Sequence, residues 1–326
     1  TYLRRYRISQ EDLLTSRLFA EGIDGRSFAS VQGLAFQRLT DEANPDSSPV
    51  ILPLADLEWQ SDPGWLGSRY NLDANALMLA RREGPQSRRF SLGGGWSVPF
   101  ITSGGQVLEA SFNLRGDVYS VQDVPQIGSP DFDGSYGRFF PEAALHWSWP
   151  LISDGDAGGS FLLEPVVNVA LSPNNLSSGK IPNEDSQVLE FSDTNVFDDN
   201  RYPGYDLVET GPRVNYGVQG QWEFDPSDYF SFLLGQNFRT SDDNRFPFTN
   251  DPNGNFSDYV GRFRVDLDEW LGASYRFRFD QEELASRRHE FNTDFTFDPV
   301  FLRLDYLDLN EDPFLGNRQE IFGWGS

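Results

Sequence analysis

Apolar and polar side chains alternate with a period of two over many segments of this 326-residue chain. In residues 107–119, Leu108 and Phe112 fall on one face of an extended backbone, while Glu109 and Asn113 fall on the other. This period is that of a β-strand, in which successive side chains point to opposite faces. The same pattern is clear in residues 213–224, 259–267 and 270–280. It predicts an all-β protein, and no segment reads convincingly as a helix.

Further strands are expected where the alternation is weaker. These candidates are residues 13–21, 27–39, 50–60, 69–80, 89–99, 138–149, 160–171, 229–239, 288–297 and 300–309. With the four clear segments they make roughly fourteen strands of about 9 to 13 residues, the length that crosses a tilted bilayer span. The whole chain, 1–326, is expected to be a single domain.

The segments between these strands alternate in length. Short turns are expected at 22–26, 62–65, 103–105, 153–159, 225–228, 268–269 and 298–300. Longer polar segments separate them at 40–49, 81–88, 121–136, 172–211, 241–257, 281–287 and 310–318. An up-and-down transmembrane barrel has short turns on the periplasmic side and long loops outside. The alternation therefore favours an antiparallel transmembrane β-barrel over a Greek-key sandwich.

The distribution of charges and rings points the same way. The apolar runs are far shorter than the ~20 residues that a membrane-spanning helix needs, so membrane insertion would have to use strands. Both charge signs occur on the polar faces of strand centres, as with Arg115 and Asp117, which suits a wide, wet lumen. Tryptophans such as Trp96 and Trp222 fall near strand ends, where an interfacial belt would lie. A soluble β-barrel or sandwich with an apolar core remains the alternative.

Composition excludes several functions. The formal net charge of −24 would repel a phosphate backbone, so no nucleic-acid partner is expected. Cysteine is absent and only two histidines occur, which argues against a metal centre, and no cofactor motif is found. His146 could serve a membrane lipase of the Ser–His type, but it is interpreted instead as a lumen or interface residue. We therefore expect no enzymatic activity.

The longest polar segment carries four blocks of distinctive sequence. Residues 181–186 read IPNEDS, 190–197 read EFSDTNVF, 200–206 read NRYPGYD and 211–217 read GPRVNYG. This ordered series resembles the signature of the lipopolysaccharide-assembly family, LptD/OstA, whose pattern is close to IPNEDS, EFDDTNLF, NRFPGYD and RVNYG. The resemblance spans nearly the whole chain.

The resemblance implies a 26-stranded outer-membrane barrel with an N-terminal periplasmic jelly roll and a lateral seam between its first and last strands. It also implies several partners: lipopolysaccharide, a lumen-plugging outer-membrane lipoprotein (LptE-like), periplasmic bridge proteins and the outer-membrane bilayer. We expect this chain to be the central part of such a barrel, located in the Gram-negative outer membrane, with the jelly roll and the first and last strands absent.

The acidic segment at 172–211 is expected to be a long extracellular loop that caps the lumen. Its polar side chains would form a lid or bind a divalent cation that bridges lipid phosphates. Alternatively, Asn and Asp only shape turns and Pro203–Gly204 fixes a bend. The candidate residues are Asn183, Glu184, Asp185, Asp193, Thr194, Asn195, Phe197, Arg201, Pro203, Gly204, Asp206, Arg213, Asn215 and Tyr216.

Three arginine pairs fall in the long-loop set and would face outward together. Guanidinium groups donate two parallel hydrogen bonds, which suits lipopolysaccharide phosphates, although loops with solvated or Glu-paired arginines are the simpler interpretation. The candidates are Arg81, Arg82, Arg88, Arg89, Arg287 and Arg288.

The function that these features favour is a translocon component that inserts lipopolysaccharide into the outer leaflet through a polar lumen and a lateral seam. Two other functions stay open. One is a passive diffusion porin, which would show steady ion conductance, and the other is a soluble carbohydrate-binding β protein, which would need no detergent.

Overall fold

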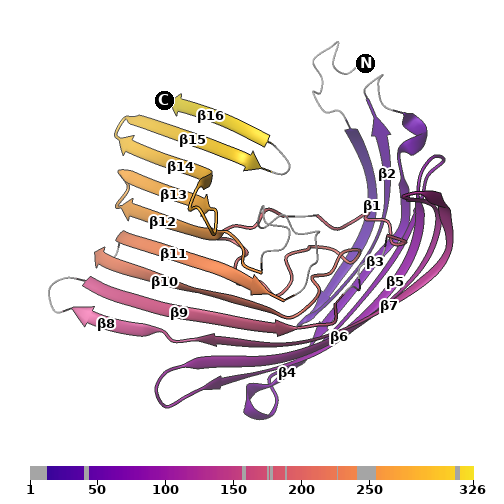
Figure 1. The fold of residues 1–326 in the computed structure, drawn as a ribbon, viewed down its shortest axis with the longest axis horizontal. Helices are drawn as coiled ribbons and strands as arrows, with labels where there is room; N and C mark the ends of the chain where they lie inside the picture. Colours follow the sequence, from indigo (N-terminus) through magenta and orange to yellow (C-terminus); the bar gives the residue numbers. More distant parts are fainter. Residues whose placement is uncertain are drawn as a thin grey trace.

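The chain forms one antiparallel, up-and-down β-sheet in a computed structural model. The structure describes residues 13–39, 44–155, 159–174, 176, 179–187, 189–225, 227–240, 255–312 and 316–326. The sheet curves strongly, and its two edge strands, β1 and β16, are not paired with each other (Figure 1). The prediction of an antiparallel partial barrel is therefore confirmed.

Sixteen strands make up this sheet within the described residues. The first eight are β1 (Leu13–Asp24), β2 (Ser27–Arg38), β3 (Val50–Gln60), β4 (Arg69–Ala80), β5 (Gln86–Ile101), β6 (Val107–Gln126), β7 (Ser129–Ser148) and β8 (Leu151–Gly155). The others are β9 (Gly159–Leu171), β10 (Arg213–Asp225), β11 (Asp228–Arg239), β12 (Tyr259–Leu267), β13 (Leu271–Phe279), β14 (Ser286–Phe297), β15 (Val300–Asp312) and β16 (Gly316–Gly325). Two 3-10 helices, η1 (Pro45–Ser47) and η2 (Trp65–Gly67), lie in connections. No helix among the described residues is long and apolar enough to cross a bilayer.

All fourteen expected strands are present, and two more were missed. β8 continues the line of β7 along β9, because Ser148 pairs with Val166 and Leu151 pairs with Leu163 in one register. Pro150 and Pro165 lie in the gap between these two ladders, where their missing N–H groups interrupt the pairing. The other missed strand, β16, carries a polar, glycine-containing sequence that resembles a loop.

The expected alternation of loop lengths is wrong in part. Residues 121–136 do not form a loop, because β6 and β7 continue as a hairpin whose turn lies at Ile127 and Gly128. Residues 81–85 form a loop as expected, but residues 86–88 belong to β5, and the described residues of the segment 310–318 are strand. Residues 40–43 and 241–254 lie outside the described residues. Glycine and proline in residues 121–136 indicated a loop. The hairpin forms nonetheless, because backbone pairing extends the sheet there without an alternating apolar face.

The two faces of the sheet differ sharply in chemistry. On β5, Arg89 and Ser91 are buried on the concave side, whereas Phe90 and Leu92 lie about half exposed on the convex side. Neighbouring strands repeat this, since Asp117 of β6 is buried while Val118 is 61% exposed. The large apolar side chains therefore lie outside and the charges inside, the reverse of a soluble protein.

The convex apolar band has the height of a bilayer core. On β5 it runs from Phe90 to Phe100, ten residues apart, and beyond Phe90 the next outward residue is the exposed Arg88. At about 3.3 Å per residue the band is ~33 Å long, and a strand tilt of ~40° reduces its height to about 25 Å. This matches the ~25 Å apolar band of outer-membrane barrels.

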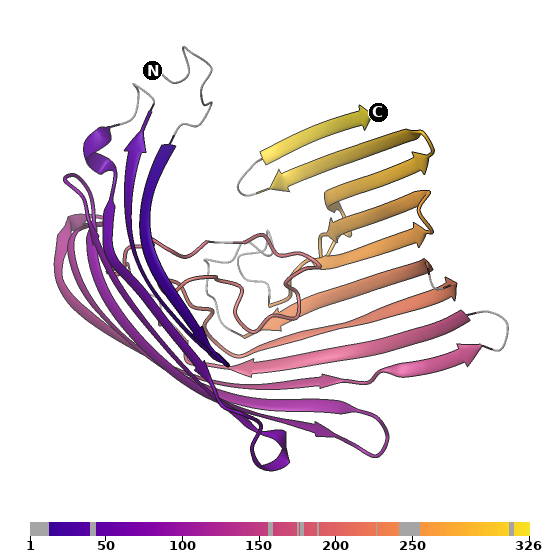
Figure 2. The ribbon, with the colours of Figure 1, turned by 180° about the vertical axis from the view of Figure 1, so that it is seen from behind.

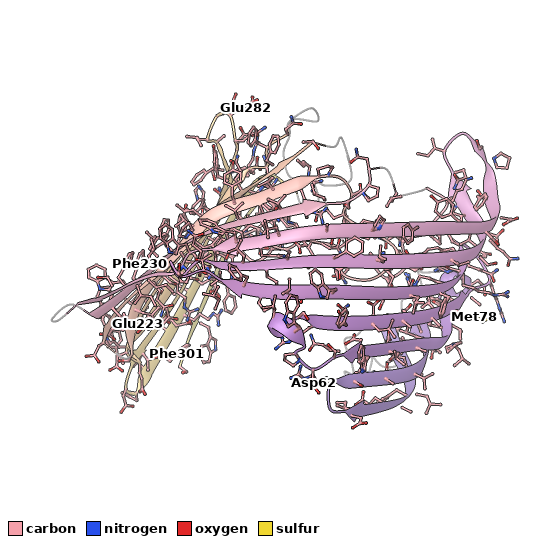
Figure 3. The ribbon with its side chains drawn as sticks, turned by 90° about the horizontal axis from the view of Figure 1, so that it is seen from below. Asp62, Met78, Glu223, Phe230, Glu282 and Phe301 are labelled. Carbon is pink, nitrogen blue, oxygen red and sulfur yellow. The ribbon has the colours of Figure 1, made fainter. Side chains whose placement is uncertain are left out.

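Tryptophan marks one edge of this band. All eight tryptophans lie toward the edge with the short turns, either near strand ends or in the turns themselves: Trp59, Trp65, Trp96, Trp147, Trp149, Trp222, Trp270 and Trp324. In Figure 3, Asp62 lies at the short-turn edge of the sheet, in the connection between β3 and β4, and Met78 lies toward the opposite edge, near the end of β4. Indole rings prefer the membrane interface, so the short-turn edge is expected to lie at one interface.

An arginine in the middle of the convex band should destabilise the protein. We expect Leu114→Arg to lower the free energy of unfolding by about 2–4 kcal/mol in a bilayer, because the charge lies in hydrocarbon. Asn113→Arg is the matched control, since the adjacent residue faces the concave side. Denaturant titration in lipid vesicles measures both variants, and equal losses would contradict the assignment of the faces.

Candidate functional site

The described residues of the segment between β9 and β10, residues 172–212, lie on the concave side of the sheet (Figures 1 and 2). We call it the inner loop. It has no regular secondary structure among its described residues, so its backbone and side chains depend on the sheet for partners. These partners come from strands on both sides of the concave face, as far apart as β5 and β14.

The first anchor of the inner loop is the carboxylate of Asp206. Arg89 of β5 donates to Asp206 Oδ1 over 2.7 Å, and the hydroxyl of Tyr119 donates to the same atom over 3.1 Å. The backbone N–H groups of Glu184 and Asp185 donate to Oδ2 over 2.8 and 3.1 Å. One buried carboxylate thus joins two parts of the loop to two strands.

Asp185 completes this anchor. Its carboxylate lies 2.7 Å from Arg89 Nη2 and accepts the backbone N–H groups of Tyr205 and Asp206. Two carboxylates therefore share a single guanidinium. Burial and the neighbouring charge of Asp185 raise the pKa of Asp206 to about 6. Burial also opposes ionisation of Asp185, but Arg89 outweighs it and keeps the pKa of Asp185 below its usual value.

The aromatic ring of Tyr205 lies between two strand arginines. The guanidinium carbon of Arg89 is 4.9 Å from the ring centroid, and that of Arg115 is 5.5 Å away. Arg138 of β7 donates to the backbone carbonyls of Tyr205 and Asp206, and it is held by Asp117 across the β6–β7 ladder at 2.7 Å. Arginines of the strands therefore bind both the ring of Tyr205 and the backbone of Tyr205 and Asp206.

A second anchor is built around Glu209, whose side chain is fully buried. Arg201 donates to Glu209 Oε1 over 2.6 Å, Arg239 of β11 donates to the same atom, and Arg213 of β10 lies 3.7 Å away. Arg213 also donates to Glu142 of β7 over 2.5 Å. Three guanidiniums and two carboxylates are thus enclosed between the inner loop and three strands.

Amide side chains extend this cluster. Asn215 Oδ1 accepts from Arg201 and from Asn237 of β11, each over 2.5 Å. Asn195 lies within the loop, where its side chain bonds the backbone of Ser192 and Glu190. These buried amides satisfy donors and acceptors that would otherwise be left without partners.

Apolar side chains pack beside the Glu209 cluster. Phe191, Val196 and Tyr202 of the inner loop are almost fully buried against Leu233 of β11 and Val260 of β12. This small core lies on the concave side, so part of the concave face is covered by apolar side chains. The inner loop is therefore packed against the sheet through buried side chains and is not a solvent-exposed connection.

Two acidic residues of the inner loop meet arginines on β12 to β14. Asp193 lies 3.3 Å from Arg262 and 3.7 Å from Arg276. Glu190 accepts from Arg288. Burial raises the pKa of Asp193, although both arginines oppose the shift.

His146 of β7 also contacts the inner loop. Its Nε2 is hydrogen bonded to Asp199 Oδ2 at 2.7 Å. The ring therefore faces the concave side and helps to hold the loop.

The remaining candidate residues have local roles. Asn183 closes a turn onto Ser186, Glu184 pairs with Arg81, and Thr194 bonds Ser192. Phe197 packs against the small apolar core, and Pro203 is exposed.

Gly204 has a positive φ of 91°, and an added Cβ would lie 2.6 Å from the carbonyl oxygen of Asp185. Glycine is thus required at this bend. Tyr216 is not part of the site, since it lies on the convex face of β10 and donates to Gln236.

Four of the six paired arginines are not in loops, contrary to the expectation. Arg88 and Arg89 lie in β5, and Arg287 and Arg288 lie in β14, because both strands begin earlier than the sequence indicated. Arg89 and Arg288 turn inward to inner-loop carboxylates, and Arg287 pairs with Asp280 at 2.8 Å. The six therefore do not face outward together. A contact with lipid phosphates stays a prediction, and the exposed Arg82 and Arg88 fit it best.

Sequence reasoning missed several residues that hold the inner loop, notably Glu209, Tyr119, Arg138 and Arg239. The alternation places these strand residues on a polar face, but only the register shows which of them meet. Glu209 carries no motif signal of its own. Among the described residues, no group of three or more His, Asp or Glu side chains is arranged to hold a metal ion.

Comparison with known proteins identifies the family. The family model of LPS transport system D, LptD, matches residues 1–321. The chain belongs to the LptD family. No curated protein sequence matches the chain. The family is one of lipopolysaccharide transport and assembly at the outer membrane, rather than a known enzyme family, which agrees with the apolar convex face and the charged concave face.

Removing the charge of Glu209 should loosen the inner loop. We expect Glu209→Gln to cost about 3–5 kcal/mol, because three buried guanidiniums lose their common counter-ion. Hydrogen exchange of residues 195–213 measures the local opening free energy in the complete protein. Glu320→Gln, which breaks an exposed pair with Arg318, is the control and should cost at most about 1 kcal/mol. Similar small losses in both variants would show that the buried cluster does not hold the loop.

Proposed function

We propose that this chain forms part of the wall of an outer-membrane translocon that inserts lipopolysaccharide into the outer leaflet. The supporting observation is the inversion of the two faces of the sheet, with apolar side chains such as Phe90 and Leu114 outside and charges such as Arg89 and Asp117 inside. A polar interior suits the sugar and phosphate headgroup, while the apolar exterior is continuous with the acyl region of the bilayer. Family membership supplies the substrate class.

The inner loop is proposed to act as the lumen-capping lid of this translocon, extending inward from the extracellular edge. The short-turn edge carries the tryptophans, and the inner loop leaves the sheet at the opposite edge, after Leu171 and before Arg213. Its anchors on β5 and β11 cross the concave face, so the loop narrows the space inside the wall. The proposal also includes further strands that close the barrel, a partner lipoprotein and a lateral seam.

Arg88 is the proposed contact to lipopolysaccharide in the outer leaflet. Its side chain is exposed on the convex face directly beyond Phe90, where the apolar band ends. No hydrogen bond or ion pair of Arg88 is found among the described residues. A guanidinium at this height would meet headgroup phosphates rather than acyl chains.

Ion conductance distinguishes a translocon whose lumen is closed by the inner loop from a diffusion porin. We expect the complete protein with its partners to show little steady ion conductance in planar bilayers. The double variant Asp185→Asn/Asp206→Asn should conduct more, because it removes both charges that hold the loop to Arg89. Heat-modified mobility in detergent gels is the control for a folded barrel. A large steady conductance of the unmodified protein would favour the porin instead.

The transport itself is tested by depleting the protein in cells and labelling newly made lipopolysaccharide at the surface. Surface delivery should stop while other barrels continue to assemble. Continued delivery at the normal rate would refute the proposed function.

A further inference from the structure

Four arginines meet on the concave face of β12, β13 and β14. Arg262 of β12 lies directly opposite Arg276 of β13, and Arg278 of β13 lies directly opposite Arg288 of β14. Like charges in directly paired positions destabilise a sheet unless anions lie between them. The ladder therefore contains two unfavourable pairs that need a counter-charge.

Arg278 and Arg288 have close carboxylate partners. Arg278 donates to Asp258 over 2.6 Å, and Arg288 donates to Glu290 over 2.5 Å and also to Glu190 of the inner loop. These contacts are short, charge-assisted hydrogen bonds. This half of the cluster is satisfied by the protein itself.

Arg262 and Arg276 are held less closely. Their carboxylate contacts are 3.3 and 3.7 Å to Asp193 and, for Arg276, 3.9 Å to Glu290. Among the described residues, the Nε atoms of Arg262 and Arg276 are buried without a hydrogen-bond partner. Two buried donors of guanidinium groups are therefore available to a further acceptor.

A cavity of about 190 Å³ lies beside Arg276, between residues 190–194 of the inner loop and strands β13 and β14. Arg276, Arg278 and Arg288 line it, together with the hydroxyl-bearing Ser192 and Thr194 and the carboxylates of Glu190 and Asp193. Arg262 lies next to the cavity, directly across the β12–β13 ladder from Arg276. The space accommodates a tetrahedral oxyanion, and the lining offers the planar guanidinium donors that bind one with two parallel hydrogen bonds.

Asp193 is the inner-loop carboxylate placed at this position. Burial disfavours its ionised form and raises its pKa, and its two arginines are not close enough to reverse that shift. A phosphate would bring more acceptor oxygens to the same donors than a single carboxylate does.

We propose that Arg262 and Arg276 form a subsite for a phosphate-type oxyanion on the concave wall, and that Asp193 occupies this subsite when no oxyanion is bound. The assignment of the oxyanion to a lipid headgroup rests on the proposed function. The same chemistry would also take free phosphate, so the experiment separates the two sources.

Binding is measured on the complete protein in lipid nanodiscs, with a bisphosphorylated glucosamine-disaccharide lipid, its dephosphorylated form and inorganic phosphate as probes. Arg262→Gln/Arg276→Gln should weaken binding of the phosphorylated lipid by about tenfold or more, since charge-assisted hydrogen bonds are lost. The dephosphorylated lipid should bind equally well to the unmodified protein and to the double arginine variant. Arg264→Gln is the control, because Arg264 faces the same side but already binds Asp266 with two hydrogen bonds.

Asp193→Asn provides the opposite result, which misfolding could not mimic. It removes the competing carboxylate, so the phosphorylated lipid should bind several-fold more tightly. A third outcome is that the variants change the affinity for inorganic phosphate in these directions, while phosphorylation of the lipid has no effect on its binding. This outcome would support the subsite but make free phosphate its ligand.

Unchanged binding of every probe in both the double arginine variant and Asp193→Asn would overturn the subsite. Surface delivery of lipopolysaccharide on depletion is a separate measurement, so a failed subsite leaves the proposed function standing.

Discussion

The structure depends on one constraint: a sheet that meets lipid on its convex face must place its charges on the concave face. Alternation along each strand does this residue by residue, as with Phe90 outside and Arg89 inside. Charges so enclosed are costly unless they are paired and hydrogen bonded. The concave wall therefore requires a partner, and the inner loop supplies carboxylates, carbonyls and an aromatic ring to it.

The inner loop is matched to different parts of the wall by charge. Asp206 and Asp185 meet Arg89, Glu209 meets Arg213 and Arg239, and Asp193 meets Arg262 and Arg276. The Glu209 cluster is fully buried and well bonded, so it should act as a fixed anchor. The contacts of Asp193 are longer, and on this difference rests the proposal of an oxyanion subsite at Arg262 and Arg276.

Much of the fold could be predicted from the sequence, because strands that cross a bilayer must alternate. The bounds of β3, β4 and β12 agree with the expected segments. Outside the membrane that requirement is absent, so the sequence beyond Ser120 resembles a loop although β6 and β7 continue there. β16 was missed for a similar reason, since its sequence is polar and it lies at the sheet edge.

The site was predicted less well than the fold. The family blocks indicated the inner loop and most of its residues, including Arg201, Asp206 and Arg213. They did not indicate Glu209, which carries no motif signal, or Arg138, whose importance comes from strand register rather than from local sequence. The paired arginines misled because adjacent residues on a strand point to opposite faces, so Arg88 and Arg89 cannot act together.

The most direct test of the inverted sheet is the accessibility of nitroxide labels placed singly at residues 107–122 in the membrane-embedded protein. Oxygen, which concentrates in lipid, and a water-soluble nickel chelate are the two quenchers. Labels at Leu108, Phe112, Leu114 and Val118 should be reached by oxygen, and labels at Glu109, Asn113 and Arg115 by nickel. From Ser120 onward, nickel should reach outward positions as well. Nickel access to both faces throughout would contradict the account.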